Sequence, residues 1–337
     1  MKTRAVAPPE WATRLFASQL APLRAAKGES GAVWSIARDR SQARISDQFK
    51  VNAGDYHARY AAASHFQDLF QHALVKTEVQ VAEAPLILDL GSGSGVNSIV
   101  PWFNLAPGAR QVATDLSGEL LAILADYALS EGLSDRVLCV VMDAMGDHVR
   151  PGQFDLVTGA SILHHLVLPN RGIRAAARAL KPGGHAIFME PFQGYGLIRL
   201  AYERILAEAV LRNDRLHPAV ELALKRMVAD IAARTMPDPT RPGFADLDDK
   251  WLFSSEHIEH AAKKMGFSRV RIVPHNDHDQ LYRDVASVQL RLAIGIEAPL
   301  ALPAWAIAIL DSFDAALPPP VKRLLMLEGT IVMTKGD

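Results

Sequence analysis

Between residues 85 and 191 the sequence alternates short apolar runs with longer helical stretches, and this alternation limits the possible folds more than any other feature. Each apolar run is continuous, which is typical of strands that helices cover on both faces. Linked strand–helix–strand units form a parallel sheet, so the pattern predicts an α/β fold. The predicted strands are residues 86–90, 110–114, 136–141, 154–158 and 185–190.

The rest of the chain is predicted to be mostly helical, apart from two further strands. After residue 191 the alternation stops for about 60 residues, then returns with a strand at 268–273 and a β-rich run at 328–334. Insertions of this size usually serve as lids or oligomer contacts, so a homodimer is one expected state. The expected division is a helical N-terminal segment 1–84, a core 85–191, a helical insertion 192–253, a core helix and strand 254–273, a second helical insertion 274–327 and a last strand 328–337.

The composition limits the kinds of partner that the chain can bind. Its 337 residues are 49% apolar and 22% charged, which suits a globular protein with a sizeable core. Because 36 Lys and Arg balance 37 Asp and Glu, no long-range attraction draws nucleic acid or anionic lipid, and neither is an expected partner. Cys139 is the only cysteine, so the chain has no internal disulfide and no Cys-based zinc site.

The sequence does not predict a membrane span either. The longest uncharged apolar stretch, residues 298–310, is shorter than the roughly 18 residues that a span needs and contains two prolines. The first residues are basic and mildly amphipathic, but they lack the continuous apolar region of a signal peptide. A cytoplasmic location is therefore expected.

A glycine-rich loop directly follows the first predicted strand. It runs from Asp89 to Gly95 with the sequence DLGSGSG. Glycines let the backbone turn tightly and approach a ligand closely, and the next helix offers free N–H groups. A dinucleotide fingerprint needs Gly or Ala at its sixth place, where this chain has Val96, so NAD is not the predicted ligand. A plain glycine-rich turn is the alternative interpretation.

Acidic residues follow three successive strands. Asp115 comes 20 positions after Gly95, where a carboxylate can accept hydrogen bonds from both hydroxyls of a ribose. Asp143 follows the third strand and can accept from an exocyclic adenine amine, and Asp89 ends the first strand. Open α/β sheets bind ligands at this edge, so the acids predict a nucleoside site, although each can also be a structural or loop-capping carboxylate.

Together these segments resemble the class I S-adenosylmethionine-dependent methyltransferases that act on small molecules. The motifs that carry the resemblance are LDLGSGSG at 88–95, TDLS at 114–117, FDLV at 154–157, LHHL at 163–166 and LKPGG at 180–184. The resemblance implies a Rossmann-like seven-stranded sheet in the order 3-2-1-4-5-7-6, with only strand seven antiparallel, a mostly helical cap, and S-adenosylmethionine as cofactor. The cofactor contacts that it implies are Asp89, Gly91, Ser92, Gly93, Gly95, Asp115, Leu116, Asp143, Ala144 and Ala160.

Two histidines and a glutamate are the candidate catalytic residues. A sulfonium methyl group is already activated, so a protein base is needed only when the nucleophile is a hydroxyl or a C–H acid. His164 and His165 follow the fourth strand on the ligand edge, and histidine accepts protons near neutral pH. We prefer His165, because adjacent side chains diverge, while Glu190 at the end of the fifth strand could also bind or deprotonate an acceptor. A packing role for the histidines and an ion-pair role for Glu190 are the alternatives.

No metal site is predicted. Residues 246–251 hold three carboxylates that could bind Mg²⁺ or a hydroxyl-rich substrate, but a solvated acidic turn explains them more simply. Residues 275–279 contain two histidines and two aspartates in a spacing that metal sites seldom use.

The predicted function is transfer of a methyl group from S-adenosylmethionine to a hydroxyl or carbon of a small, partly apolar acceptor, such as a secondary metabolite. Methylation of a nitrogen atom, which needs no strong base, is one alternative. The other is a non-catalytic protein that binds the cofactor or a partner. The intact glycines and the three strand-end acids argue against the latter.

Overall fold

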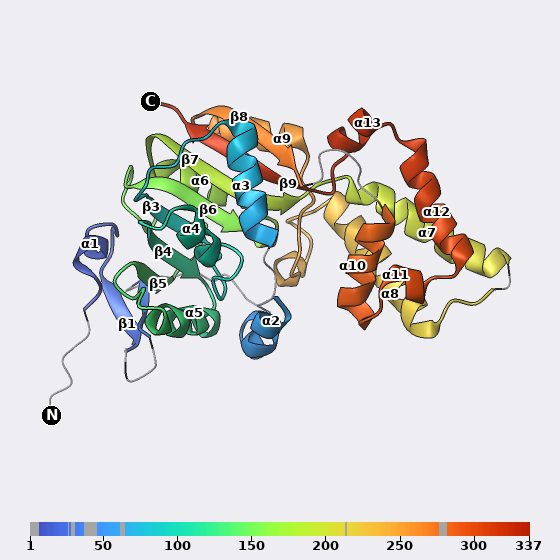
Figure 1. The fold of residues 1–337 in the computed structure, drawn as a ribbon, viewed down its shortest axis with the longest axis horizontal. Coiled ribbons are helices and arrows are strands. Elements are labelled where there is room, and N and C mark those ends of the chain that lie inside the picture. The colour runs from blue at the N-terminus through green and yellow to red at the C-terminus, as the bar shows by residue number, and fades with distance from the viewer. Residues whose placement is uncertain are drawn as a thin grey trace.

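The computed structural model describes residues 7–25, 27, 31–36, 46–60, 65–212, 214–275 and 282–337. Among these residues one sheet of nine strands forms the centre of the fold, in the order β1-β2-β5-β4-β3-β6-β7-β9-β8 (Figure 1). The strands are β1 (Leu20–Arg24), β2 (Val33–Ile36), β3 (Leu86–Leu90), β4 (Arg110–Asp115), β5 (Val137–Val141), β6 (Phe154–Ala160), β7 (Leu180–Pro191), β8 (Phe267–Pro274) and β9 (Glu328–Lys335).

Strands β3 to β9 reproduce the predicted order, with β9 antiparallel to both β7 and β8. The predicted number of strands was wrong, because β1 and β2 extend the sheet beyond β5 and β1 is a second antiparallel strand. Three of the four residues of β2 are buried, and this strand pairs in parallel with β5. An apolar run of four residues is too short for its periodicity to separate a strand from a helix, so the N-terminal segment is not the helical unit that we expected.

Two layers of helices cover the sheet. Phe70 and Trp102, from helices on one face, pack in the same core cluster as Ile87 of β3. Leu88, the next residue of β3, faces the other layer and packs in a cluster with Ile173. Burial on both faces explains why the predicted strands are continuously apolar. The helices are α3 (His65–Thr77), α4 (Ile99–Leu105) and α5 (Gly118–Ser130) on the first face, and α6 (Pro169–Ala179) and α9 (Ser255–Lys264) on the second.

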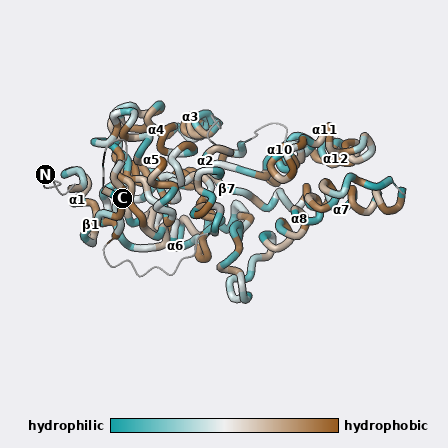
Figure 2. Tube along the Cα trace, turned by 90° about the horizontal axis from the view of Figure 1, so that it is seen from below, coloured by the Kyte–Doolittle hydropathy of each residue, from teal (hydrophilic) through white to brown (hydrophobic). Residues whose placement is uncertain are grey.

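Both long insertions join in one helical bundle. The bundle begins after β7 and ends before β9, and it lies beside the sheet rather than on it (Figures 1 and 2). Tyr202, Leu224, Leu290 and Leu310 belong to its own buried core. A buried ion pair, Lys322 to Asp314 at 3.4 Å, connects its last two helices. The helices are α7 (Tyr195–Leu211), α8 (Pro218–Thr235), α10 (Tyr282–Ile294), α11 (Ala298–Ala301), α12 (Ala304–Ala316) and α13 (Pro319–Leu324).

Several short elements complete the described chain. Among all the residues that the structure describes, no helix is both long enough and apolar enough to cross a membrane. The remaining elements are α1 (Glu10–Thr13), η1 (Asp47–Phe49), α2 (Ala53–Tyr60), η2 (Leu163–His165) and η3 (Phe244–Asp246).

Candidate active site

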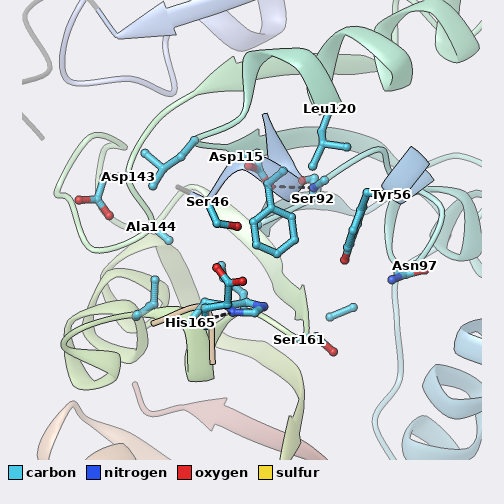
Figure 3. Close-up of a pocket in the computed structure, with 18 of the residues that line it drawn as sticks. Ser46, Tyr56, Ser92, Asn97, Asp115, Leu120, Asp143, Ala144, Ser161 and His165 are labelled. Atoms are coloured by element: carbon cyan, nitrogen blue, oxygen red, sulfur yellow. Dashed lines mark hydrogen bonds between the residues drawn. The ribbon is translucent and has the colours of Figure 1, made fainter. Parts of the chain in front are cut away.

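A cavity of about 460 Å³ opens at the carboxyl ends of β3, β4, β5 and β6. Figure 3 shows Asp115 and Ser92 on one side of it, Asp143 on another, and His165 and Ser161 opposite Asp115. The volume lies within the roughly 300–1,000 Å³ that small-molecule sites occupy. Parallel strands bring their carboxyl ends to one edge of the sheet, and this is why residues from four separate motifs meet there.

The glycine loop forms one wall of the cavity. Gly91, Gly93 and Gly95 have φ angles of +69°, +52° and +81°. Residues with a Cβ rarely adopt such a backbone conformation. A Cβ on Gly93 would meet no protein atom closer than 3.9 Å, so the space beside this glycine belongs to the cavity. The Gly93 N–H donates to Asp115 Oδ2 at 2.8 Å, and this bond ties the loop to the next strand. The loop therefore presents bare backbone to a ligand.

Two of the strand-end acids line the cavity. Asp115 accepts backbone hydrogen bonds from Gly93 and Ser117, one on each oxygen and both 2.8 Å long. Burial raises the pKa of Asp115, and these backbone bonds oppose that rise. Asp143 Oδ1 accepts from the Met145 N–H at 2.8 Å. Because a carboxylate oxygen has two lone pairs, Asp115 keeps acceptor capacity for a ligand.

Asp89 points away from the cavity, contrary to the prediction that it contacts the cofactor. It is fully buried, and its two oxygens accept hydrogen bonds of 2.6 Å from the hydroxyls of Ser98 and Thr158. Burial raises its pKa to about 6, although the hydroxyl bonds act in the opposite direction. Asp89 therefore supports the glycine loop from beneath. The other predicted cofactor contacts line the cavity, namely Gly91, Ser92, Gly93, Gly95, Asp115, Leu116, Asp143, Ala144 and Ala160.

Glu190 lies behind the cavity wall and holds the loop that carries both histidines. The chain turns sharply at Ser161, which has a left-handed φ of +63°. Glu190 then accepts the N–H groups of Ile162 and Leu163, at 3.1 and 2.7 Å, and that of His164 at 3.2 Å. It also lies 2.7 Å from His164 Nδ1 and is 2% exposed. The predicted catalytic contact with an acceptor does not match this position, because Glu190 is already engaged by four donors.

His164 is buried between two carboxylates. Its Nδ1 faces Glu190, and its Nε2 lies 3.4 Å from Asp249 Oδ1. Burial would lower the pKa of His164, but Glu190 and Asp249 outweigh this effect and raise it to about 9. An imidazolium cannot accept a proton, and the side chain does not line the cavity. The structure therefore gives His164 a supporting position rather than the predicted catalytic one.

His165 does line the cavity. Its Nδ1 lies 2.8 Å from the carbonyl oxygen of Asp248, which can only accept a hydrogen bond. Burial lowers the pKa of His165 to about 3, and the neighbouring His164 cation acts in the same direction. The ring is therefore neutral at physiological pH, with its proton on Nδ1 and a lone pair on Nε2.

Aromatic residues from the N-terminal segment also line the cavity, although they were not among the predicted site residues. Phe49 packs edge-on against Tyr56, with ring centroids 5.0 Å apart, and against His165 at 5.6 Å. His57 Nδ1 lies 2.9 Å from the Ser94 hydroxyl, so α2 is tied to the glycine loop. No motif marks these residues, because they reach the site only through the tertiary fold.

The segment at 246–251 is exposed at residues 246–248, as predicted for a solvated turn, and it also forms part of the cavity rim. Leu247, Asp248 and Lys250 line the cavity, and Lys250 is 5% exposed. Asp249 lies within ion-pair distance of His164, and its Oδ2 is 3.1 Å from Arg234. Described residues of the bundle helices α7, α8 and α10 to α13 do not line the cavity, so the expected cap is reduced to η1, α2 and this segment.

Two clusters bear on metal binding. Among the described residues, His164, His165 and Asp249 bring their ligand atoms within 4.8 Å of one another. The hydrogen bond from His165 to Asp248 and the pairing of Asp249 with Arg234 account for this cluster, so we assign no metal to it. In the other candidate cluster His275 faces Glu328 at 3.4 Å, and residues 276–279 lie outside the described residues.

Comparison with known proteins places the site in context. Residues 88–188 match the family model described as a methyltransferase domain. A ubiquinone biosynthesis O-methyltransferase of Idiomarina loihiensis is 32% identical over 102 residues, which cover 30% of this chain and 40% of the relative. A demethylmenaquinone methyltransferase of Mycolicibacterium gilvum is 29% identical over 174 residues, which cover 51% of this chain and 71% of the relative. The chain thus spans less than half of the first of these relatives.

Solved structures show the same fold at low sequence identity. The Haemonchus contortus phosphoethanolamine N-methyltransferase 2 in complex with S-adenosyl-L-methionine has a TM-score of 0.51 and 16% identity, over 85% of this chain and 57% of that one. A Haloferax volcanii putative methyltransferase bound to the Trm112 activator also has a TM-score of 0.51, with 15% identity over 87% of this chain and all of that one. These likenesses concern the fold alone.

Proposed function

The chain carries a class I S-adenosylmethionine-dependent methyltransferase domain, and from this premise we propose that it moves the methyl group of S-adenosylmethionine to a hydroxyl or carbon of a small, partly apolar acceptor. One observation carries the proposal. The glycine loop, Asp115 and Asp143 come from three different strand ends, yet they line one cavity.

The residues present fit this cofactor. The bare backbone at Gly93 leaves room for its amino-acid end, and Asp115 has acceptor capacity for the two ribose hydroxyls. Asp143 and Ala144 would hold the adenine edge, and Ala160 would lie toward the sulfonium. When bound, the cofactor supplies a methyl group that is already activated, so the protein has mainly to orient the acceptor and exclude water.

The remaining walls suit a flat acceptor. Phe49 and Tyr56 offer aromatic surface, and His165 offers the lone pair of Nε2 to a hydroxyl hydrogen. Two of the curated relatives are named for ubiquinone biosynthesis and for demethylmenaquinone methylation, and these names support a quinone-type ring as the acceptor class.

One observation favours a second candidate, methylation of an amine. Neither histidine is an effective proton acceptor near neutral pH. The pKa of His165 is about 3, so its ring binds a proton weakly, and the pKa of His164 is about 9, so its ring is already protonated. An amine can lose its proton to water before it reacts, so it needs no protein base.

Calorimetry with S-adenosylhomocysteine tests the proposed function, with NAD as the matched control. We expect micromolar affinity for the former and no heat from the latter. A screen of phenols, C–H acids and amines with radiolabelled cofactor then separates the two candidates by the acceptor that becomes labelled. Binding of NAD alone would contradict both.

A further inference from the structure

Asp249 joins two other parts of the molecule, the η2 loop and α8, through one carboxylate. Its Oδ1 lies 3.4 Å from His164 Nε2 and 3.3 Å from His165 Nδ1. Its Oδ2 lies 3.1 Å from a guanidinium nitrogen of Arg234, which is a largely buried residue near the end of α8. A single side chain thus connects the helical bundle with the loop that carries the cavity histidine.

The backbone around Asp249 is bound to the same two places. The Lys250 N–H donates to the carbonyl of His164 at 2.9 Å, and the Trp251 indole N–H donates to that of Leu166 at 2.8 Å. The Leu252 N–H donates to the carbonyl of Arg234 at 3.2 Å. Hydrogen bonds to the η2 loop and to α8 therefore fix the position of the segment that bears Asp248 and Asp249.

The contacts of His165 determine which of its nitrogens carries the proton. Both oxygens near Nδ1, from the Asp248 carbonyl and the Asp249 carboxylate, accept hydrogen bonds. Nδ1 must donate, so Nε2 keeps its lone pair for the cavity. The opposite tautomer would place two acceptors against an unprotonated nitrogen.

We infer that Asp249 is a positioning residue that holds His165 as the Nδ1–H tautomer, and that Arg234 of the bundle anchors Asp249 for this purpose. The role of His165 toward an acceptor rests on the proposed function. The assignment of the Nδ1–H tautomer does not rest on the proposed function, because it follows from the contacts of the ring. Docking of the bundle therefore controls the chemistry of a cavity that its helices do not line.

Nitrogen NMR of the histidine rings in the full chain tests the inference, with His165→Gln used to assign the signal. We expect the Nδ1–H form in the unchanged protein. Asp249→Ala should shift the tautomer ratio about tenfold toward Nε2–H, because a charge-assisted contact is lost. Arg234→Met should shift the ratio in the same direction, and the double variant should go no further than Asp249→Ala alone.

Two further variants keep the test decisive. Glu221→Gln removes an exposed acid from the same helix and should leave the ratio unchanged. Asp249→Asn has nearly the same size and guards against a failure of Asp249→Ala to fold. An unchanged ratio in both Asp249 variants would overturn the inference. Calorimetry with S-adenosylhomocysteine distinguishes failure of this inference from failure of the proposed function. If the protein binds no adenosyl ligand but its Asp249 variants shift the tautomer ratio, the proposed function is refuted and the inference stands.

Discussion

Among single residues, Asp89 of β3 and Asp115 of β4 differ in what they face. Asp89 turns inward to two hydroxyls and has no exposed surface. Asp115 turns toward the loop backbone and the cavity. Asp89 lies inside β3, opposite Ala113, whereas Asp115 is the last residue of β4. This difference in position along the strand decides which acid supports the loop and which one can meet a ligand.

Asp115→Ala should weaken binding of S-adenosylhomocysteine about tenfold to a hundredfold, because a charge-assisted hydrogen bond is worth about 1.5–3 kcal/mol. Calorimetry measures the change in Kd. Asp284→Ala removes an exposed carboxylate in the bundle and serves as the control. Unchanged affinity in Asp115→Ala would place the ribose elsewhere.

His164 makes stability depend on pH. Its pKa is about 9 in the folded protein and 6.5 ordinarily, so its stabilisation is fully present below pH 6.5 and is lost as the pH rises through 9. The free energy of unfolding should fall over this range by on the order of 3 kcal/mol. Urea denaturation at pH 6, 7.5 and 9 measures it, and His164→Gln should flatten the trend. A trend of equal size in that variant would show that other groups cause it.

At the scale of elements, η2 depends on β7 for its shape. Its backbone N–H groups point at the Glu190 carboxylate, which the end of β7 presents. A charged acceptor can satisfy several donors at once, and this explains why a buried acid lies behind a loop whose first residue has a left-handed φ.

Glu190→Gln should destabilise the protein by about 3–5 kcal/mol, because it removes one partner of a buried ion pair. Chemical denaturation measures the loss. The control is Glu203→Gln on α7. Glu203 is exposed and pairs with Arg199 at 3.5 Å, so this change should alter the stability by less than about 1 kcal/mol. Equal effects from the two variants would refute the role assigned to Glu190.

At the scale of the whole molecule, the sheet and the bundle have separate cores. The bundle cluster includes Leu224 and Tyr202, and the clusters on the sheet contain neither. The two parts meet through the ends of β7 and β9 and through the segment that carries Asp249.

Leu224→Ala should cost about 2–5 kcal/mol of bundle stability, since it leaves a cavity in a packed core. Affinity for S-adenosylhomocysteine should stay within about twofold, because described residues of α8 do not line the cavity. Hydrogen exchange of the α8 amides and calorimetry measure the two quantities. A large loss of affinity would mean that the bundle closes over the cofactor.

The parallel core of the sheet, the glycine loop and the places of Asp115 and Asp143 along the chain could be predicted from the sequence. Continuous apolar runs indicate strands that are buried on both faces. A parallel sheet brings the carboxyl ends of its strands to one edge, where the cavity lies. Local pattern therefore carries that part of the site. The strand bounds placed Asp89 inside its strand and Asp115 at the end of the next, but they did not show that the hydroxyls of Ser98 and Thr158 enclose Asp89.

The roles of the remaining residues depend on contacts between elements that lie far apart in the sequence. His165 meets Asp248 across 83 positions of sequence, and Phe49 reaches the same cavity from the N-terminal segment. Glu190 was expected at the acceptor, but it lies behind the wall because four donors of the η2 loop fold onto it. Such contacts depend on how separate elements pack, and no periodicity or motif within one element records that packing.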